Sequence, residues 1–162
     1  MLLFDHQTDT AQENFTMDRF DEKILHALKC DGRISNVELS ERVGLSPSAT
    51  LRRVQELERK GVIKGYRAVL DSNQLGIGFV AYVSIGLASH SKKAQQEFED
   101  HVRFVDEVVE CHNITGANEY LLRVETKDLV AYKKFHADVL GECEQVKSIT
   151  TMVVMDSPKD ER

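Results

Sequence analysis

Residues Ser35–Gly61 read SNVELSERVGLSPSATLRRVQELERKG and predict two short helices joined by a tight turn. Ser35, with a glutamate three residues later, forms a capping box that starts the first helix. Gly44 falls where that helix needs a left-handed residue to end. Ser46 then caps a second helix, whose first position holds a proline that needs no N–H there. This pattern is typical of a helix-turn-helix, whose second helix enters the major groove of DNA.

A further helix is predicted before this segment. Phe20, Ile24 and Leu28 recur every fourth residue, with Asp18 ahead as a cap and Gly32 behind as a stop. Helices of this length are marginally stable alone, so the three helices are expected to pack through their apolar stripes.

The last of the three helices carries the side chains that are expected to meet DNA. Leu51, Val54 and Leu57 are expected to face inward. The outward set is Ser48, Ala49, Arg52, Arg53, Gln55 and Glu56. The alternative is an ordinary small helical bundle with solvated charges, but two caps around a glycine turn favour DNA binding.

The expected DNA contacts divide by their chemistry. Hydroxyl groups near the start of the helix, with the helix N-terminus, are expected to hold phosphates. Two adjacent arginines are candidates for guanine edges or phosphates, and basic residues on either side would add contacts to the DNA backbone. The predicted DNA-binding residues are Ser46, Ser48 and Thr50 with Ala49, then Arg52 and Arg53, and the flanking Arg33, Lys64 and Arg67.

Charge is distributed unevenly along the chain. The formal net charge is −6, which is unusual for a protein that binds nucleic acid. Residues 17–67, however, contain 11 Lys and Arg against 8 Asp and Glu, whereas residues 68–162 contain 10 against 16. Positive charge is therefore confined to the predicted DNA-binding module, and the acidic remainder is expected to have another role.

The second half of the chain predicts a sheet with helices on one face. Val62–Leu70 suits a wing or a linking strand, and alternating apolar residues follow over 79–87. The order strand-helix-strand-strand-helix-strand is the split βαβ plan of a ferredoxin-like, antiparallel α+β sandwich. The further elements are predicted at 91–104 (helix), 108–115 and 120–126 (strands), a helix capped by Asp128, and a strand at 149–155.

The other face of this predicted sheet is not polar. Val80 and Tyr82 lie opposite the inward row of the first strand, and the last strand has apolar groups on both sides. Such a face is larger than a soluble monomer exposes, so a second subunit packed sheet against sheet is expected. A twofold assembly also places two recognition helices about 34 Å apart. The alternative is a ligand-binding monomer with a partly covered sheet.

Several functional classes lack their signatures. Cys30, Cys111 and Cys143 have no paired spacing, which indicates reduced structural thiols and not a zinc or disulfide framework. There is no nucleophile elbow, no phosphate-cradling glycine loop and no clustered acid pair. No apolar run approaches a membrane span, and the N-terminus is no signal peptide. We expect a cytoplasmic protein that is not an enzyme, with no cofactor, metal or membrane partner.

Several stretches together resemble one family of prokaryotic transcription regulators, the Lrp/AsnC (leucine-responsive regulatory protein/asparagine regulator) family. They are Asp18–Gly32, Leu39–Pro47, Arg53–Gly61, Gly116 with Tyr120-Leu121-Leu122, and Val153-Val154-Met155. The resemblance covers residues 17–155 and implies a winged helix-turn-helix followed by an αβ-sandwich (RAM-type) domain that dimerises and assembles further, for example into octamers.

The corresponding domain boundaries are predicted as follows. A flexible extension occupies residues 1–16, and the winged helix-turn-helix domain with its linking strand occupies 17–77, the helix-turn-helix itself lying at about 36–55. The oligomerisation and effector domain occupies 78–157, and a tail occupies 158–162.

The resemblance also implies amino-acid effectors bound between subunits, at the turn Gly116–Tyr120. Backbone N–H groups freed by a glycine turn suit an α-carboxylate, and the Glu119 carboxylate suits an ammonium group. The alternative is a simple hairpin turn. The predicted effector-binding residues are Gly116, Asn118, Glu119, Tyr120, Leu129, Met152, Val153 and Val154.

The predicted function is sequence-specific, amino-acid-responsive regulation of genes of amino-acid metabolism. The expected partners are double-stranded DNA, an amino acid and further copies of the chain. One alternative is an architectural DNA-wrapping protein without an effector. The other is an enzyme that resembles sirohaem decarboxylases, which would need cationic and histidine groups around a large pocket.

Overall fold

The computed structural model describes residues 16–159, so most of the predicted N-terminal extension and the last three residues of the predicted tail lie outside it. The chain divides into two compact units, the first ending at Ala68 and the second beginning at Val69. The sequence-based boundary between residues 77 and 78 assigns the intervening segment to the first domain and stays a prediction.

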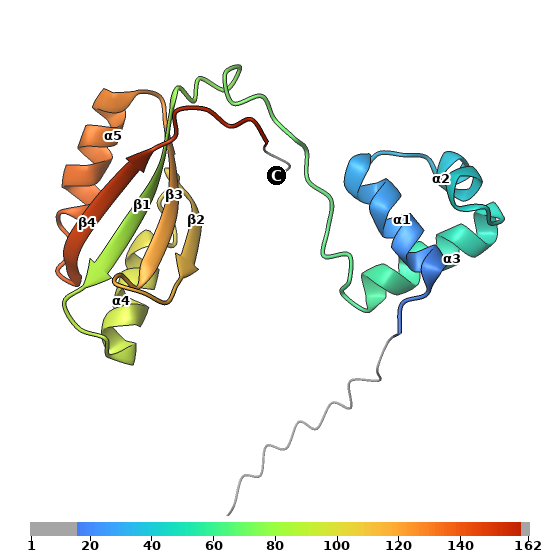
Figure 1. Ribbon diagram of the computed structural model, residues 1–162, viewed down its shortest axis with the longest axis horizontal. Coiled ribbons are helices and arrows are strands. Elements are labelled where there is room, and N and C mark those ends of the chain that lie inside the picture. Colours follow the sequence, from blue (N-terminus) through green and yellow to red (C-terminus); the bar gives the residue numbers. More distant parts are fainter. Residues whose placement is uncertain (1–15, 160–162) are drawn as a thin grey trace, which may run out of the picture. The chain divides into compact units, whose positions relative to one another are not determined.

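The first unit is helical, as predicted. It contains α1 (Arg19–Cys30), α2 (Asn36–Val43) and α3 (Pro47–Arg59), shown in Figure 1. The predicted punctuation is confirmed: Ser35 and Glu38 form the capping box of α2, and Gly44 ends that helix with a φ of 75°. The core of the unit consists of Ile24, Ala27, Leu39, Val43 and Leu57.

The inward face of α3 differs from the expectation. Leu51 is 47% exposed, whereas Thr50 is fully buried. Thr50 precedes Leu57 by seven residues, which is two helical turns, so both side chains point the same way. Its hydroxyl donates to the carbonyl oxygen of Ser46 at 3.1 Å, which satisfies it without an external partner.

The segment after α3 folds back without forming the predicted strand. No strand lies between α3 and Phe79 in this described part of the chain. The N–H groups of Val62 and Ile63 donate to the carbonyl oxygen of Leu57 at 2.9 and 3.1 Å, and Ile63 packs against the helical core. The Tyr66 hydroxyl then donates to Glu58 at 2.9 Å, which anchors the segment to α3.

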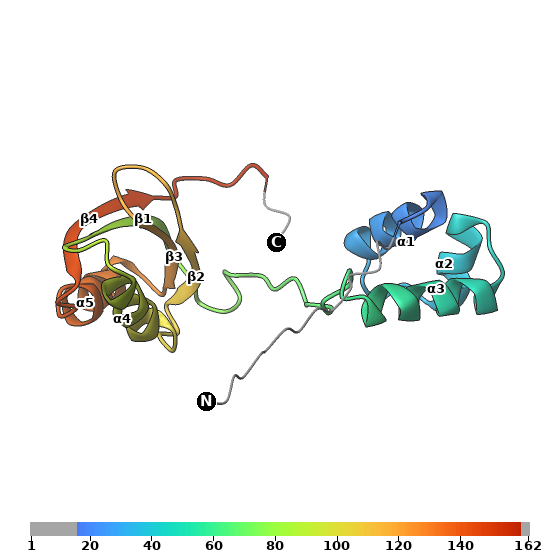
Figure 2. The same ribbon diagram turned by 90° about the horizontal axis from the view of Figure 1, so that it is seen from below.

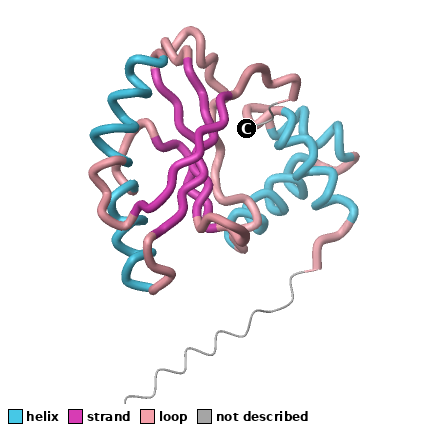
Figure 3. The backbone as a smooth tube through the Cα atoms, turned by 60° about the vertical axis from the view of Figure 1, so that its left-hand side comes forward, coloured by secondary structure: helices cyan, strands magenta, loops and turns pink. Residues whose placement is uncertain are grey.

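The second unit is the predicted antiparallel α+β sandwich. Its strand order is β2-β3-β1-β4. Figures 2 and 3 show both helices on one face of the sheet. The elements are β1 (Phe79–Leu87), α4 (Lys92–Val102), β2 (Val108–Asn113), β3 (Tyr120–Thr126), α5 (Leu129–Phe135), a π-helical turn (His136–Leu140) and β4 (Val146–Val153).

The register explains which residues form the core. In β1, Val83 pairs with Leu122 of β3 and with Thr151 of β4, so alternate residues of all three strands face the helices. Phe98 of α4 fills the centre of this layer and stacks against Tyr120 with ring centroids 4.7 Å apart. The fully or nearly buried β1 residues are Ala81, Val83, Ile85 and Leu87.

The uncovered face of the sheet is less apolar than expected. Tyr82 of β1 pairs with Arg123 of β3 and with Met152 of β4, so an arginine lies in the middle of this face. Arg123 forms an ion pair with Glu125. The face is therefore apolar around Tyr82 and Met152, polar where Ser84 pairs with Thr150, and charged at Arg123 and Glu125.

Two general features complete the description. Of the described helices, none is long and apolar enough to cross a membrane. The cysteines are free thiols. Cys143 lies in the core, whereas Cys30 and Cys111 are exposed, so the expectation of structural thiols fits only Cys143.

Candidate nucleic-acid interface and effector loop

One face of α3 carries the polar side chains that remain exposed. Ser48, Arg52 and Gln55 are separated by four and three residues, which places them on the same side of the helix. Arg52 forms no ion pair or hydrogen bond with any other described residue, and Ser48 contacts only the Ser46 hydroxyl, at 3.2 Å. This face offers hydroxyl, guanidinium and amide groups to an external partner.

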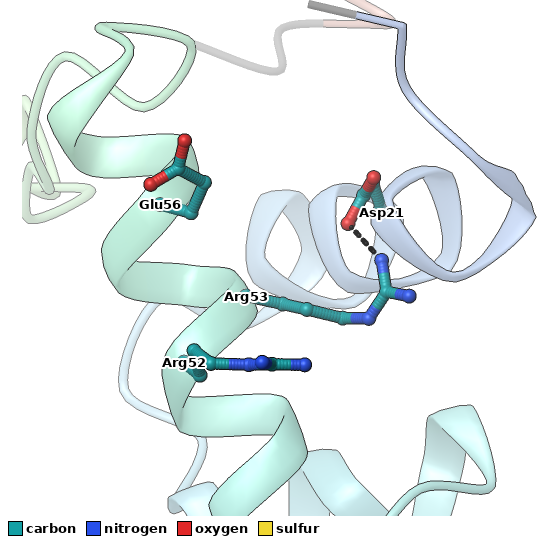
Figure 4. Close-up of a pocket in the computed structure, with 4 residues that line it drawn as sticks. All are labelled: Asp21, Arg52, Arg53 and Glu56. Atoms are coloured by element: carbon teal, nitrogen blue, oxygen red, sulfur yellow. Dashed lines mark hydrogen bonds and ion pairs between the residues drawn. The ribbon is translucent and has the colours of Figure 1, made fainter.

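Arg53, the neighbour of Arg52, is differently placed. Figure 4 shows both side chains extending from α3, with Arg53 reaching Asp21 of α1. The Arg53 Nη1 atom lies 2.8 Å from Asp21 Oδ1, and its Nη2 atom lies 2.9 Å from Asp18 Oδ2. The Arg53 side chain is 28% exposed, and its guanidinium also lies 5.5 Å from the centre of the Phe20 ring.

Asp18 and Asp21 each use one carboxylate oxygen to cap α1 and the other to bind Arg53. Asp18 Oδ1 accepts the N–H groups of Phe20 and Asp21, which caps α1, and its other oxygen meets Arg53. Asp21 Oδ2 accepts the Asp18 N–H in the same capping box, and its other oxygen meets Arg53. The N-terminus of α1 is thus tied to the middle of α3.

The electrostatics of the cluster favour the charged state of each group. The Asp21 N–H lowers the pKa of the Asp18 carboxyl, and Arg53 lowers it further. The hydrogen bond to Asp21 raises the pKa of Arg53. The hollow that Asp21, Arg52, Arg53 and Glu56 line is therefore of mixed charge, and only Arg52 contributes a guanidinium that has no carboxylate partner among the described residues.

One predicted DNA contact, Thr50, is therefore wrong, and a second, Arg53, is paired within the chain, so that its DNA contact stays a prediction. The Thr50 side chain cannot contact phosphate because it is fully buried on the inward face of α3. Arg53 is not the free guanidinium that was expected, because both of its terminal nitrogens are already paired with carboxylates. No sequence signal separated Arg52 from Arg53, since the difference depends on where α1 packs.

The remaining predicted DNA contacts occupy suitable positions. Ser46 caps α3 by accepting the Ala49 N–H at 3.3 Å, and Ala49 is half-buried. Arg33, Lys64 and Arg67 are exposed on the segments that flank the helix-turn-helix. Their roles stay predictions.

Asn36 contributes to this site, although sequence reasoning did not select it. Its side-chain amide donates to the carbonyl oxygen of Pro47 at 2.9 Å, which ties the first residue of α2 to the first residue of α3. Asn36 therefore fixes the geometry of the helix-turn-helix. The signal was an asparagine placed directly after the Ser35 cap, where no local role required it.

The loop between β2 and β3 holds the first part of the predicted effector site. Gly116 has a φ of 141°, which only glycine adopts readily. The Glu119 N–H donates to the carbonyl oxygen of Ile85 in β1 at 3.0 Å, and the Ile114 N–H donates to Glu119 at 2.8 Å. Among the described atoms, the N–H groups of Gly116, Ala117 and Asn118 have no acceptor.

The Glu119 carboxylate is already occupied within the chain. Its Oε2 accepts the Leu87 N–H at 2.7 Å, and its Oε1 lies 2.7 Å from the His90 Nδ1. The side chain is 13% exposed. Glu119 thus attaches the loop to β1, and its predicted role as the partner of an ammonium group stays a prediction.

Tyr120 is a core residue, and its predicted effector contact is wrong. Its ring is buried between the sheet and α4, and its hydroxyl donates a hydrogen bond to the Glu99 carboxylate of α4 at 2.7 Å. Burial, together with the Glu99 carboxylate, raises its pKa to about 12.

The other predicted effector residues lie at the opposite end of the sheet in the same chain. Tyr120 pairs with Ile85, whereas Val153 pairs with Ala81 and Leu129 follows the far end of β3. Ala81 and Ile85 are four residues apart in β1, so at about 3.3 Å per residue Val153 lies about 13 Å along the sheet from Tyr120, and Leu129 lies beyond the end of β3. The expected grouping is therefore not formed within one chain. The residues of this second group are Leu129, which is 63% exposed, and Met152, Val153 and Val154.

Comparison with known proteins decides the family. Residues 80–162 match the Lrp/AsnC ligand binding domain, and residues 17–64 match a winged helix-turn-helix DNA-binding domain. The chain is 41% identical to the proline dehydrogenase transcriptional activator of Rhizobium radiobacter over 96% of both chains. It is also 41% identical to the leucine-responsive regulatory protein of Escherichia coli, over 88% of this chain and 87% of that protein. The chain belongs to the Lrp/AsnC family.

Solved structures of other Lrp/AsnC regulators share the fold. A Neisseria meningitidis transcriptional regulator in complex with L-Met matches with a TM-score of 0.86 and 36% identity, over 90% of this chain and 94% of that one. An AsnC-family regulator from Agrobacterium tumefaciens matches with a TM-score of 0.84 and 34% identity, over 89% and 94%. The predicted fold and the predicted function as a DNA-binding transcription regulator of this family are confirmed.

Acid is expected to release the effector loop of this Lrp/AsnC protein. The Leu87 N–H is the largest cause that lowers the pKa of Glu119 below its ordinary value of 4.5, and His90 adds to it. Because the folded pKa is lowered, the stabilisation is complete above 4.5 and is lost as pH falls through the lowered pKa. The amide chemical shift of Leu87, followed by NMR, should titrate with a midpoint below 4.5.

Two variants calibrate this titration. Glu119→Gln should abolish it, because the side chain can no longer ionise. Glu142→Gln, at an exposed position, should leave it unchanged. A midpoint at or above 4.5 in the wild type would contradict the attachment of Glu119 to β1.

Proposed function

We propose that this Lrp/AsnC regulator reads DNA through the exposed face of α3 and that an amino acid bound at the β2–β3 loop modulates this activity. The observation that carries the DNA-binding part is Arg52, which has no carboxylate partner among residues 16–159 and lies beside Ser48 and Gln55 on one exposed face of a capped helix. Guanidinium groups pair with guanine edges or phosphates, and amide groups pair with adenine.

Arg52→Ala is expected to weaken operator binding without unfolding the protein. Loss of a base contact costs about 1–3 kcal/mol, which corresponds to roughly a 5- to 150-fold loss of affinity. If Arg52 contacts a phosphate instead, the slope of log affinity against log salt concentration should decrease in magnitude by about one. Gel retardation of promoter DNA at several salt concentrations separates the two outcomes.

Lys92→Ala is the matched control for this experiment. Lys92 is an exposed cation at the start of α4, in the other unit. Its removal changes the net charge equally but should leave DNA affinity unchanged. Equal affinities of wild type and Arg52→Ala would remove Arg52 from the interface.

The effector part rests on the loop that contains Gly116. Three consecutive backbone N–H groups that have no acceptor in the described part of the chain suit a carboxylate, the group that every free amino acid carries. The similar regulator from N. meningitidis binds L-Met, and a similar protein is named for its response to leucine. We infer an L-amino acid as the effector class and amino-acid metabolism as the controlled process.

We further propose that the chain works as a homodimer that assembles into a larger homo-oligomer. The uncovered sheet face is apolar around Tyr82 and Met152, and a second copy packed on it would bury that surface. A dimer could also bring the loop of one copy close to the effector residues at the other end of the sheet in its partner. An amino acid can shift the assembly only if it binds one oligomeric state better than another.

Light scattering and DNA retardation with individual amino acids test the effector proposal together. An effector should change the mass distribution, the DNA affinity or both. A protein that binds unrelated DNA sequences equally well, and that ignores every amino acid in both assays, would instead be the architectural DNA-wrapping alternative.

A further inference from the structure

The effector loop is attached to the sheet by a side chain that lies across two strands. The Asn118 Nδ2 atom donates to Ser84 Oγ of β1 at 2.8 Å. The Ser148 hydroxyl of β4 donates to Asn118 Oδ1 at 3.3 Å. We call Ser84, Asn118 and Ser148 the Asn118 bridge. Both ends of one carboxamide thus hold a hydrogen bond within the chain, one at Nδ2 and one at Oδ1.

A glycine below the bridge makes room for it. A Cβ atom at Gly86 would lie 2.4 Å from Ser148 Oγ and 2.7 Å from Asn118 Oδ1, closer than real Cβ atoms approach. Gly86 is buried, and it does not need a positive φ. Space for the Asn118 carboxamide therefore accounts for glycine at this position in the middle of a strand pairing.

The strand changes register directly after this glycine. The β1–β4 pairing shifts between Gly86 and Leu87, and the Leu87 N–H is directed to the Glu119 carboxylate. Consecutive loop residues, Asn118 and Glu119, are therefore fixed to consecutive parts of β1. A simple hairpin would need only the Ile114–Glu119 backbone hydrogen bond that closes the turn.

We propose that the Asn118 bridge positions the effector loop and does not itself touch the effector. Ser84 and Ser148 hold the Asn118 carboxamide, and this fixes the direction of the N–H groups at residues 116–118. An N–H array that is fixed before binding loses less conformational entropy when a carboxylate arrives, which increases affinity. This inference rests on the proposed effector site, and it assigns Ser84, Gly86 and Ser148 as positioning residues.

The test compares Ser84→Ala with Asn118→Ala in the full-length protein. Isothermal titration with each L-amino acid first identifies one that binds the wild type. Ser84→Ala should then weaken that binding by roughly 5- to 10-fold, the value of one hydrogen bond. Asn118→Ala should cost a similar factor, and the double variant should cost no more than the larger single effect.

Further measurements separate positioning from general damage. Ser84→Thr retains the hydroxyl and should restore affinity. DNA binding without effector, the oligomeric mass and the melting temperature should be close to wild type in all of these variants. Hydrogen exchange of the Ile114 and Glu119 amides, which form the backbone hydrogen bonds of the loop, should be faster in Ser84→Ala than in the wild type, and exchange elsewhere should be similar.

The outcomes distinguish this inference from the proposed function. If the wild type binds an amino acid but Ser84→Ala binds it equally well, the positioning role is overturned. If only Asn118→Ala weakens binding, Asn118 is a direct ligand contact and the inference is also overturned. If no amino acid binds the wild type, the effector proposal fails; unchanged loop exchange in Ser84→Ala would then show that the bridge does not fix the loop either.

Discussion

Replacing Arg53 with alanine should lower the free energy of unfolding of the helical unit by about 2–3 kcal/mol. Charge-assisted hydrogen bonds contribute about 1.5–3 kcal/mol each, and partial exposure of the Arg53 side chain reduces their combined effect. The variant leaves the buried Asp21 carboxylate with only the Asp18 N–H as its partner. Hydrogen exchange of the α1 and α3 amides in the full-length protein measures this change unit by unit.

Arg52→Ala is the matched control for Arg53→Ala. Both variants remove one guanidinium from adjacent positions of α3, but Arg52 has no carboxylate partner among the described residues. Arg52→Ala should therefore leave the exchange of α1 and α3 unchanged while weakening DNA binding. Arg53→Lys should recover only part of the lost stability. A lysine ammonium lacks the planar guanidinium whose two terminal nitrogens bind the two carboxylates. Equal exchange in Arg53→Ala and the wild type would show that the ion pairs do not hold α1 to α3.

Gly86→Ala should destabilise the sheet unit by about 1–3 kcal/mol, the usual cost of overpacking. The added methyl group would overlap with Asn118 Oδ1 and Ser148 Oγ, so both side chains must rotate away and the Asn118 bridge must open. The backbone is not the cause, because Gly86 has no positive φ. Hydrogen exchange of the β1, β3 and β4 amides measures the change, and effector binding should be lost with it.

Removing the two overlapping side chains provides the control. In a background that carries Asn118→Ala and Ser148→Ala, Gly86→Ala should cost less than about 0.5 kcal/mol, because alanine is otherwise better than glycine in a strand. Effector affinity should stay low in this triple variant, since the bridge is absent. An undiminished cost in that background would mean that another neighbour excludes the methyl group.

The DNA-binding module illustrates which features local sequence can predict. Helix starts and ends depend on residues within one turn, so the Ser35 box, the Gly44 stop and the Ser46 cap could all be identified from neighbouring residues. Alternating apolar residues likewise predicted the strands that form the sheet. These features need no knowledge of distant contacts.

The errors share a different cause. Arg52 and Arg53 are chemically identical, and only the packing of α1, 32 residues earlier at Asp21, pairs one of them. Thr50 was selected for its hydroxyl, although its seven-residue spacing from Leu57 predicts that it faces inward. Leu129 and Val153 were grouped with Gly116 from the family resemblance, which implies a site between subunits; they lie apart within one chain, so this grouping stays a prediction.

The sequence by itself determined the element order, the caps, the confinement of positive charge to one module and the family, because each depends on residue type and short spacing. Tertiary structure alone decided which arginine has carboxylate partners, why Gly86 is a glycine and which groups form hydrogen bonds with the side chains of Asn118 and Glu119. Those features depend on contacts between residues about 30 positions apart or more. Such contacts arise only when the helices pack and the strands pair in register, and no local pattern encodes them.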